Sequence, residues 1–585
     1  MVPLRKQLKD AKKASRQTPD RPSLEKHGVT HKNQERLARW ELTVGIEIHA
    51  QLNSPHKLFS SASTLYSDTP NTTVHPFDLA VPGSQPILQL QPIIPAVRAA
   101  LALGCTVQPR SSFDRKHYFY HDQPAGYQIT QYYSPFARDG RITLTARDGL
   151  GPDEEPIVVG IKQIQLEQDT ARTQDQDSET SLIDYNRSGC ALIEIISLPH
   201  MHSAAAAAAY VRKVQSILYA VDAVTTGMEL GGLRADVNVS VRRRGTSIDQ
   251  PEAHAVHEYA GVTGLGQRTE IKNLSSPSAV ASAVAAEYDR QTKLIEDGLS
   301  VLGETRGWSL SSPDTTRLLR GKEGEVDYRY MPDPDIPPLH VSADLVTYLK
   351  DTLPPLPEDL QRMLEQKYHL SPADAEAMLS LDDGARLLYY QEVVSLLFNG
   401  VSSRNIERII NDSTTGSNKH QKSNTSKVEA VDEREKHKLS IQASNWILHE
   451  LGARLSQTET QWTPALIPAQ QMADLILLHH TNRITGSSGK RLLKAMFAGD
   501  RSDAAAIVLR DNMLFEPMSD EEYTVLLDRV LGTHPGEVEV IRAGGRKAEA
   551  ILKFLVGQAM RNGSFKGRVE ALKVETMLRK RLLSD

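Results

Sequence analysis

The sequence predicts an α+β protein, with a sheet-rich N-terminal part followed by a helical C-terminal part. In the first half, short segments alternate apolar and polar residues, which is the two-residue repeat of a half-buried strand. In the second half, apolar residues recur at three- and four-residue spacing, which is the repeat of a helix. Because 585 residues are too many for one ordinary core, we expect roughly two to four domains.

The clearest strand is ELTVGIEIHAQL, residues 41–52. Every second residue from Leu42 to Ala50 is apolar, so Glu47 and His49 share the opposite face of the strand. The simplest interpretation of that face is the solvated outer surface of an antiparallel sheet.

Three further segments alternate in the same manner: residues 164–169, 232–242 and 268–274. Their polar faces carry Glu167, Asp236 and Lys272, respectively. A merely solvated sheet more often shows Lys, Thr and Glu without such variety. A ligand-binding face and an ordinary solvated face therefore both remain open.

Carboxylates from separate strands suit one kind of chemistry in particular. Glu and Asp offer the hard oxygen ligands that Mg²⁺ prefers, and the metal can bridge the phosphates of ATP. Basic side chains nearby would neutralise charge during phosphoryl transfer. Imidazole suits transition metals better than Mg²⁺, so on chemistry alone His49 is either a metal ligand or a hydrogen-bonded structural residue.

The C-terminal half contains a break in its helical pattern. Residues 412–437 are polar, lack aromatic side chains and cannot bury enough surface to offset chain entropy. We expect this stretch to be a disordered insertion within a helical region.

The first 40 residues also differ from the rest of the chain. They are rich in Lys and Arg and contain no hydrophobic signal-peptide core. This pattern resembles an organellar transit segment more than a secretory one, and a disordered basic arm is the alternative.

Composition excludes several classes of protein. A net charge of −5 excludes a globally basic nucleic-acid binder but leaves room for a local patch. Cys105 and Cys190 have no CxxC spacing, which excludes a disulfide framework and a Cys-rich zinc site and fits a reducing compartment. No apolar run approaches the roughly 20 residues of a bilayer span, so we expect no membrane partner.

Competing catalytic motifs are weak. GSSGKR, residues 486–491, lacks the spacing and the Ser or Thr of a P-loop, and no GxGxxG follows a strand. There is no Gly/Ser-rich amidase signature, and Cys190 in an apolar run is typical of a small core residue. If nitrogen chemistry occurs on this chain, its ammonia must come from elsewhere.

Two longer segments and five shorter ones carry a family resemblance. The long ones are FDRKHYFYHDQPAGYQITQYYSP, residues 113–135, and TRLLRGKEGEVDYRYMPDPDIPPL, residues 316–339. The others are VGIEIHAQL, LEQDTAR, DYNRSGCALIEI, GLRADVNVSVR and TEIKNL. In this order, from about residue 41 to 340, they resemble the signature series of the B subunit of the tRNA-dependent amidotransferases. VGQAMRNGSFKGRVEALKVETMLRKRL is similar, more weakly, to the tail domain of that family.

The resemblance implies three domains after the leader of residues 1–40. We expect a cradle-shaped catalytic domain over residues 41–345, built on an antiparallel sheet and distantly similar to glutamine synthetase. A helical domain over residues 355–520 and a small helical, tRNA-binding tail over residues 521–585 would come after it.

The resemblance also implies a reaction and partners. ATP would phosphorylate the side-chain carboxylate of Glu misattached to tRNA(Gln), with Mg²⁺ as the metal, and ammonia would displace the phosphate to give Gln-tRNA(Gln). A separate amidase subunit would supply the ammonia, and a small third subunit would complete the complex. With a basic leader, the expected location is the mitochondrial matrix.

Site residues are carried over residue by residue from the matching motifs. The expected metal ligands are Glu47, His49, Glu167 and Asp236, with Glu229 as a weaker candidate, and the expected catalytic residues are Glu47, Glu167 and Lys272. The expected contacts to ATP phosphates or the tRNA acceptor end are Lys116, Tyr118, Arg320 and Lys322. Surface salt bridges and core packing are the alternative for these last four and for Lys272.

The tail carries bases that would track a tRNA backbone or, equally, form a solvated helix face: Lys566, Arg568, Lys573, Arg579, Lys580 and Arg581.

The chain departs from the family pattern at several positions. Ala125 stands where the family usually has Lys, Leu230 where it has a second Glu, and Gln168 where it has another Glu. The zinc-binding cysteines of some relatives are missing, so we expect no structural zinc.

Two other hypotheses are compatible with the sequence. The first is a non-catalytic, tRNA-binding assembly subunit, which would predict decayed acids on the sheet face. The second is a glutamine-synthetase-like enzyme acting on free glutamate, which would need neither a helical domain nor a basic tail.

Overall fold

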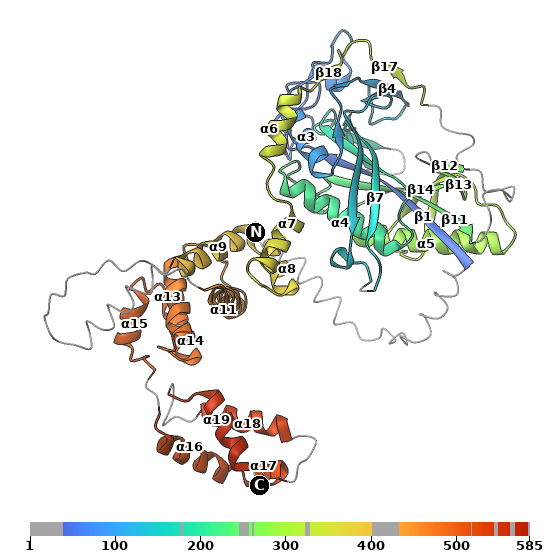
Figure 1. Cartoon of the computed structure of the whole chain (residues 1–585). Coiled ribbons are helices and arrows are strands. Elements are labelled where there is room, and N and C mark those ends of the chain that lie inside the picture. The colour runs from blue at the N-terminus through green and yellow to red at the C-terminus, as the bar shows by residue number, and fades with distance from the viewer. Residues whose placement is uncertain are drawn as a thin grey trace. The chain divides into compact units, whose positions relative to one another are not determined.

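The computed structural model describes residues 39–582, apart from residues 152, 176–179, 245–256, 260–261, 322–327, 400–431, 516–517, 543–547 and 562–567. The chain divides into two compact units, one ending at Leu356 and the other beginning at Pro357. The first unit contains the strands and the second is helical, which confirms the α+β class (Figure 1). The predicted leader lies outside the described residues, except for its last two.

A nine-stranded sheet forms the centre of the first unit, in the order β16-β15-β14-β11-β1-β10-β7-β6-β2. Its strands are β1 (Trp40–Gln51), β2 (Thr106–Val107), β6 (Ala137–Leu144), β7 (Ile157–Gln168), β10 (Ala191–Ser197), β11 (Leu233–Arg243), β14 (Thr269–Leu274), β15 (Glu304–Trp308) and β16 (Thr316–Gly321). Neighbouring strands are antiparallel except for β14 and β15, which are parallel. The predicted antiparallel sheet is therefore mixed at one pair, because α5 crosses between β14 and β15.

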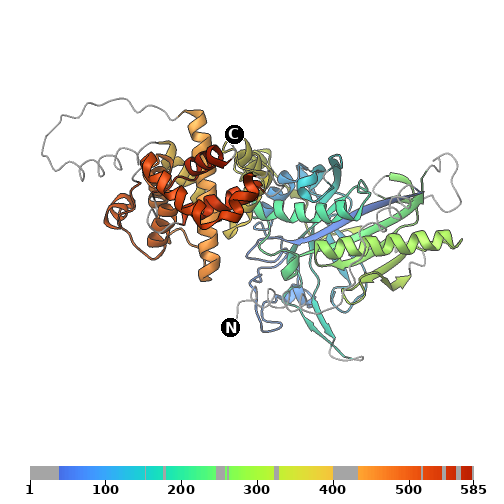
Figure 2. The same ribbon diagram turned by 90° about the horizontal axis from the view of Figure 1, so that it is seen from below.

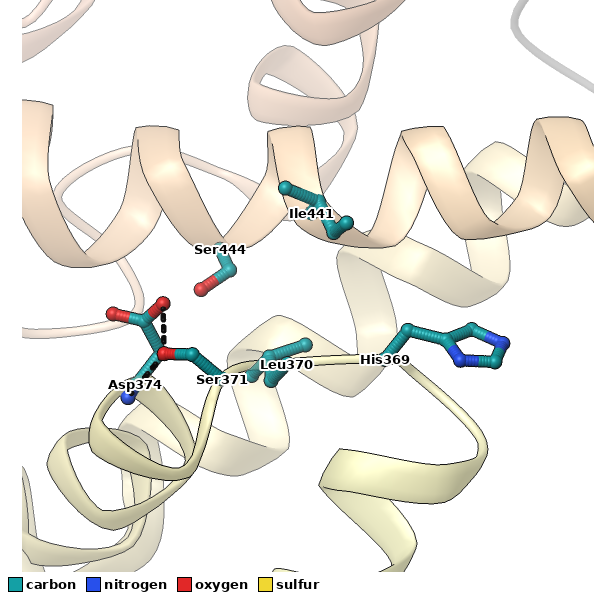
Figure 3. A pocket seen from close by; sticks show the side chains of 6 residues that line it. All are labelled: His369, Leu370, Ser371, Asp374, Ile441 and Ser444. Atoms are coloured by element: carbon teal, nitrogen blue, oxygen red, sulfur yellow. Dashed lines mark hydrogen bonds between the residues drawn. The ribbon is translucent and has the colours of Figure 1, made fainter.

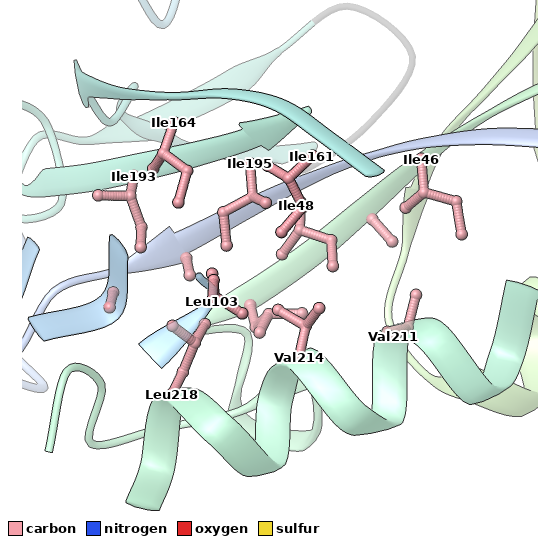
Figure 4. Packing of buried hydrophobic residues seen from close by; sticks show 14 of the residues in the cluster. Ile46, Ile48, Leu103, Ile161, Ile164, Ile193, Ile195, Val211, Val214 and Leu218 are labelled. Carbon is pink, nitrogen blue, oxygen red and sulfur yellow. The ribbon is translucent and has the colours of Figure 1, made fainter. Parts of the chain in front are cut away.

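Helices α3 (Ile93–Ala102), α4 (Ala204–Ala220) and α5 (Pro277–Glu296) cover one face of this sheet (Figure 1). Figure 2 shows α4 and α5 running along the same side of the sheet. Ile46 and Ile48 of β1 point toward Val211 and Val214 of α4 (Figure 4), and both isoleucines are fully buried. The apolar positions of the predicted strand therefore face the helices.

The side-chain oxygens of Ser203 and Ser276 set the start of the two long helices. Ser203 accepts a hydrogen bond from the Ala206 N–H at the start of α4, and Ser276 accepts one from the Ala279 N–H at the start of α5. Each serine satisfies one of the amide groups left unpaired by a helix N-terminus.

A small three-stranded sheet covers part of the opposite face. It consists of β4 (Asp114–His117), β5 (Tyr127–Thr130) and β17 (Met331–Pro332), in the order β17-β4-β5. The Ile129 N–H donates to Gln168 Oε1 at 3.2 Å, and the Leu166 N–H donates to Gln131 Oε1 at 3.1 Å, so β5 lies against β7. The solvated-face interpretation is wrong at the centre of the sheet, where polar side chains are buried.

The first unit contains further short elements. These are the 3₁₀ helices at Pro76–Leu79, Ala146–Asp148 and Met228–Leu230, helix α6 (Ala343–Asp351), and the paired strands β3 (Arg110–Ser111) with β18 (Leu339–His340), β8 (Arg172–Asp175) with β9 (Ser181–Asp184), and β12 (His257–Tyr259) with β13 (Val262–Leu265).

The described helices of the second unit pack around two separate apolar clusters. The first cluster extends from Leu364 to Met513 and the second from Met518 to Leu582. Around the first lie α7 (Pro357–Gln366), α8 (Pro372–Ser380), α9 (Ala385–Phe398), α11 (Glu433–Ser444), a π-helix (Asn445–Glu450), α12 (Leu451–Thr458), α13 (Ala469–His480), α14 (Gly486–Phe497) and α15 (Ala504–Arg510). Around the second lie α16 (Asp520–Thr533), α17 (Pro535–Arg542), α18 (Ala548–Met560) and α19 (Ala571–Leu582).

Helix α11 begins at Glu433, inside the stretch 412–437 that the sequence assigns to an insertion. Its first turn is acidic, which suits a helix N-terminus, and Leu439 and Ala443 bury its later turns. The rest of the predicted insertion, residues 412–431, lies outside the described residues. Within the described ranges, no helix combines the length and the apolar composition that crossing a membrane requires.

Candidate active site

The register of the central strands brings polar side chains onto one face of the sheet. Glu47 lies opposite Asp236 on β11, and His49 lies opposite Glu194 on β10. Gln165 on β7 lies opposite Glu194 in turn. Directly opposed residues of antiparallel strands point to the same side, so side chains from four strands meet here.

Three of these side chains form a compact group suited to a cation. His49 Nε2 lies 3.7 Å from Glu167 Oε1 and 3.9 Å from Glu194 Oε1, and the ligand atoms of all three lie within 4.8 Å of one another. Glu167 and Glu194 are only 2% and 6% exposed. Two carboxylates and an imidazole can bind a divalent ion, and the carboxylate oxygens are the donors that Mg²⁺ prefers.

Hydrogen bonds from β5 and β7 orient both carboxyl groups. Gln128 Nε2 donates to Glu167 Oε1 at 2.6 Å, and Thr130 Oγ1 donates to Glu167 Oε2 at 3.1 Å. Gln165 Nε2 donates to Glu194 Oε2 at 2.5 Å and also contacts Thr130 Oγ1 at 3.0 Å. The small covering sheet therefore holds Glu167 directly, and holds Glu194 through Gln165, which contacts Thr130.

Burial and charge move the pKa values of the two acids in opposite directions. Burial alone would raise the pKa of Glu167, but Lys116, His49 and a hydrogen bond from Glu194 bring it below its ordinary value. Burial and the negative charge of Glu167 raise the pKa of Glu194 well above its ordinary value. Burial and the charge of Glu167 therefore favour a proton on Glu194, shared with Glu167 through their hydrogen bond, and a bound cation would favour its release.

Lys116 of β4 lies next to this pair of acids. Burial disfavours its ammonium form, but the negative charge of Glu167, above all, raises its pKa well above the ordinary value. Its Nζ also lies 5.0 Å from the ring centroid of Tyr328. The ring of Tyr118 lies 6.5 Å from that of Tyr328, and burial raises the pKa of Tyr118, which keeps its phenol neutral.

A second charged cluster lies along β11 and β14. Lys272 Nζ lies 3.1 Å from Asp236 Oδ2 and 2.7 Å from Glu270 Oε1, and the Asn273 N–H donates to Asp236 Oδ1 at 2.8 Å. Burial opposes ionisation of Asp236, but Lys272 and His49 lower its pKa. Burial likewise opposes the ammonium form of Lys272, and the two acids raise its pKa. Both groups are therefore charged at neutral pH.

The predicted residues that lie on the polar face form two sets. His49 and Glu167 belong to the compact group, with Lys116 and Tyr118 beside it. Glu47, which accepts a hydrogen bond from Asn238 Nδ2 at 3.0 Å, lies on the same face with Asp236 and Lys272.

The remaining predicted residues lie elsewhere. Arg320 of β16 lies opposite Thr305 at the far edge of the sheet and is exposed, while Lys322 lies outside the described residues. Glu229 accepts hydrogen bonds from the Tyr219 hydroxyl at 3.1 Å and the Gly227 N–H at 3.3 Å. Because Tyr219 belongs to α4, Glu229 is attached to the helix layer and not to the polar face.

Sequence reasoning missed Glu194. On β10 its neighbours on the same face are Leu192 and Ile196, so the strand shows no polar alternation. The available signal was an isolated acid within the apolar run ALIEIIS, which a buried strand tolerates only when the acid has partners.

The residues that depart from the family pattern differ in their burial. Gln168 is buried and accepts the hydrogen bond from Ile129, so it joins the two sheets, whereas Ala125 and Leu230 are exposed. Burial raises the pKa of Cys105 and of Cys190 to about 12, so both remain thiols and neither supplies a nucleophile.

Most of the described tail bases are already paired with acids. Arg568 binds Glu522, Lys573 binds Asp520, Arg579 binds Glu549 and Arg581 binds Asp528, at distances of 2.6–3.0 Å. Lys580 is exposed, and Lys566 lies outside the described residues. Exposed ion pairs are weak, so a phosphate backbone would compete for these bases.

A pocket of about 270 Å³ lies in the second unit (Figure 3). It is lined by His369, Leu370, Ser371, Asp374, Ile441 and Ser444. The carboxylate of Asp374 accepts a hydrogen bond from Ser371 Oγ at 2.8 Å. This lining contains one acid, unlike the group on the sheet, so the sheet face is the candidate active site.

Comparison with known proteins finds matches to two family models. Residues 42–347 match the sequence model described as the GatB/GatE catalytic domain, and residues 428–582 match the one described as the GatB domain. The fold and the site therefore define a protein of the GatB/GatE catalytic class, with the carboxylate group inside the matched catalytic region.

Relatives from fungi narrow the class to one family. Three fungal proteins are named as the B subunit of mitochondrial glutamyl-tRNA(Gln) amidotransferase. Those of Aspergillus fumigatus and Neosartorya fischeri are 49% identical to this chain, and that of Penicillium rubens is 48% identical to it. Each match covers 100% of this chain and 90–92% of the relative. The chain belongs to the family of glutamyl-tRNA(Gln) amidotransferase B subunits, which confirms the resemblance found in the sequence.

Proposed function

We propose that this chain is the subunit of a mitochondrial tRNA-dependent amidotransferase that activates the glutamate of misacylated Glu-tRNA(Gln) for conversion to Gln-tRNA(Gln). The observation that carries the proposal is the buried group of His49, Glu167 and Glu194 beside Lys116. The names of the fungal relatives support the substrate.

The proposed reaction has two steps. A side-chain oxygen of the esterified glutamate attacks the γ-phosphorus of ATP, ADP leaves, and a mixed anhydride forms. Ammonia then attacks the activated carbonyl carbon, loses a proton, and expels inorganic phosphate. Phosphorylation is needed because an unmodified carboxylate has no good leaving group.

Charges on the polar face suit the first step. His49, Glu167 and Glu194 would hold Mg²⁺, with Glu47 and Asp236 as the further predicted ligands on the same face; the ion would supply positive charge to the phosphates. Lys116 and Lys272 carry fixed positive charge toward the region where phosphate oxygens gain negative charge. Tyr118 and Arg320 would position the substrates at the edges of this region.

The ammonia would come from a partner amidase subunit, because both described cysteines are buried thiols. A small third subunit would complete the assembly, and the mitochondrial matrix is the proposed location, in keeping with the names of the relatives.

The deciding experiment uses the reconstituted complex with Glu167→Gln. We expect Glu-tRNA(Gln)-stimulated ATP hydrolysis to fall at least about 100-fold, because a carboxylate ligand of the proposed Mg²⁺ is lost, while the glutaminase activity of the partner persists. Glu41→Gln is the matched control, since Glu41 lies on the same central strand but pairs with Arg242 away from the group.

Three outcomes separate the hypotheses. Full activity of the Glu167→Gln complex would contradict a catalytic role and favour an assembly subunit. Amidation of free glutamate without tRNA would favour a glutamine-synthetase-like enzyme. Loss restricted to the tRNA-stimulated reaction supports the proposal.

A further inference from the structure

A cluster of tyrosine rings lies beside the candidate active site and takes no part in the chemistry proposed above. Tyr132 stacks on Tyr330 with ring centroids 3.9 Å apart and planes inclined by 9°. Tyr133 meets Tyr132 edge-on at 5.1 Å. Despite these contacts, Tyr132 is 47% exposed and Tyr133 is 55% exposed.

A row of contacts joins this cluster to the carboxylates. Lys116 lies opposite Gln128 on β5, and Gln128 donates a hydrogen bond to Glu167; Lys116 Nζ lies 5.0 Å from the ring centroid of Tyr328. Tyr328 lies 6.0 Å from Tyr330, which carries Tyr132 on its face. The exposed ring therefore stands at the outer end of a row that begins at the acids.

The arrangement leaves one face of Tyr132 available. Tyr330 covers the other face in parallel, and Tyr133 fixes the ring from its edge, so the ring is held rigidly although it is exposed. A packed but exposed aromatic face suits stacking on a nucleobase, and Lys116, two rings further along the row, suits the phosphate groups of the same ligand.

We propose that Tyr132, supported by Tyr330, is a stacking platform for an adenine base. This inference rests on the proposed function, whose two large substrates both present adenine: ATP, and the 3′-terminal adenosine that carries the amino acid on tRNA. In either case the platform would position a base at the outer end of the row while phosphate or ester groups reach Lys116 and the acids.

The test compares three variants in the reconstituted complex. Tyr132→Leu removes the ring and should raise the KM for one adenine-bearing substrate about tenfold with little change in kcat, as expected for the loss of one base stack. Tyr132→Phe keeps the ring and should retain the wild-type KM. Tyr120→Leu is the control, because Tyr120 is also exposed on the same segment but contacts His121 instead of the row.

The substrate whose KM changes identifies the source of the adenine. A rise for ATP assigns the platform to the nucleotide, and a rise for Glu-tRNA(Gln) assigns it to the terminal adenosine. Unchanged KM values for both would overturn the inference. So would a Tyr132→Leu effect confined to thermal stability or to elution with the partner subunits, because the ring would then serve packing or assembly.

A binding measurement separates failure of this inference from failure of the proposed function. In the Tyr132→Trp complex, we expect ATP or uncharged tRNA to change the fluorescence of the introduced indole, even if no Gln-tRNA is formed. If the wild-type complex is inactive but Tyr132→Trp gives this response, the function is overturned and the adenine platform is retained. If the wild-type complex is active, Tyr132→Trp gives no response and Tyr132→Leu leaves both KM values unchanged, the platform alone is overturned.

Discussion

The two faces of the nine-stranded sheet are built by the same strands and are both buried at the centre, yet burial has opposite consequences on them. On the helix-covered face, β1 contributes Ile46 and Ile48, which need only close packing. On the other face, the same strand contributes the half-buried Glu47 and His49, which lie among the buried acids Glu167, Glu194 and Asp236, and buried carboxyl groups need partners. The apolar face therefore supplies stability, whereas the polar face supplies charge whose cost depends on pH and ligands.

The largest effect is expected from the apolar face. Ile48→Ala should lower the free energy of unfolding of the first unit by about 2–5 kcal/mol, because it removes buried methyl and methylene groups and leaves a cavity beside α4. Urea titration followed by near-UV circular dichroism would measure this change. The folded Ile48→Ala protein should keep the wild-type kcat. If its kcat fell along with its stability, the apolar face would affect catalysis as well, and the two faces would not have separate roles.

A smaller effect, dependent on pH, is expected from Glu194→Gln. Because the folded-state pKa of Glu194 is raised, the unfolded chain releases this proton at lower pH than the folded chain does. Glu194 therefore costs stability as pH rises from its unfolded pKa toward its folded one. Without divalent ions, Glu194→Gln should gain stability relative to wild type across that window, as measured by urea midpoints at successive pH values.

In the same experiment, Glu167→Gln should change the stability of the protein in the opposite direction. The folded-state pKa of Glu167 is lowered, so the stability it contributes is present above its unfolded pKa and is lost as pH falls through the folded value. Its variant should lose stability relative to wild type at neutral pH. If the stability of the two variants depended on pH in the same way, this would contradict a proton shared between Glu167 and Glu194.

The smallest effect is expected on the helical tail. Arg581→Ala removes an exposed pair with Asp528 and should change the free energy of unfolding by less than about 1 kcal/mol. If Arg581 also contacts a phosphate backbone, the salt dependence of tRNA binding should become less steep, by about one unit in the slope of log affinity against log salt. A titration of tRNA binding at several salt concentrations would measure this slope, and an unchanged slope would leave Arg581 as a surface ion pair.

Local patterns predicted much of this sheet because alternation is a property of single strands. The segments around Glu47, Glu167 and Asp236 were recognisable as strands with polar faces, and the structure places all three on one side. The same patterns do not report what covers a face. That required β4 and β5, whose cover over the sheet depends on contacts between residues far apart in the chain.

The features that escaped prediction have the same nonlocal origin. Glu194 was hidden because it is the one charged residue of its strand, and the neighbours on its own face, Leu192 and Ile196, are apolar. The parallel pairing of β14 with β15 depends on the path of α5 and not on the composition of either strand. His49 was expected as a metal ligand, but its contact with Glu194 follows from the register of β1 against β10, which no local pattern reports.

The central position of the first strand has a consequence for biosynthesis. Glu47 pairs across the ladder with Ile196 on one side and with Asp236 on the other. During translation, β1 must therefore wait with both edges unpaired until most of the first unit has been made, and such nonlocal closure slows folding and exposes the strand to aggregation. We expect the newly made chain to depend on chaperones until β11 is available. We also expect any truncation that removes β1 to disrupt both the apolar core and the polar site of the sheet.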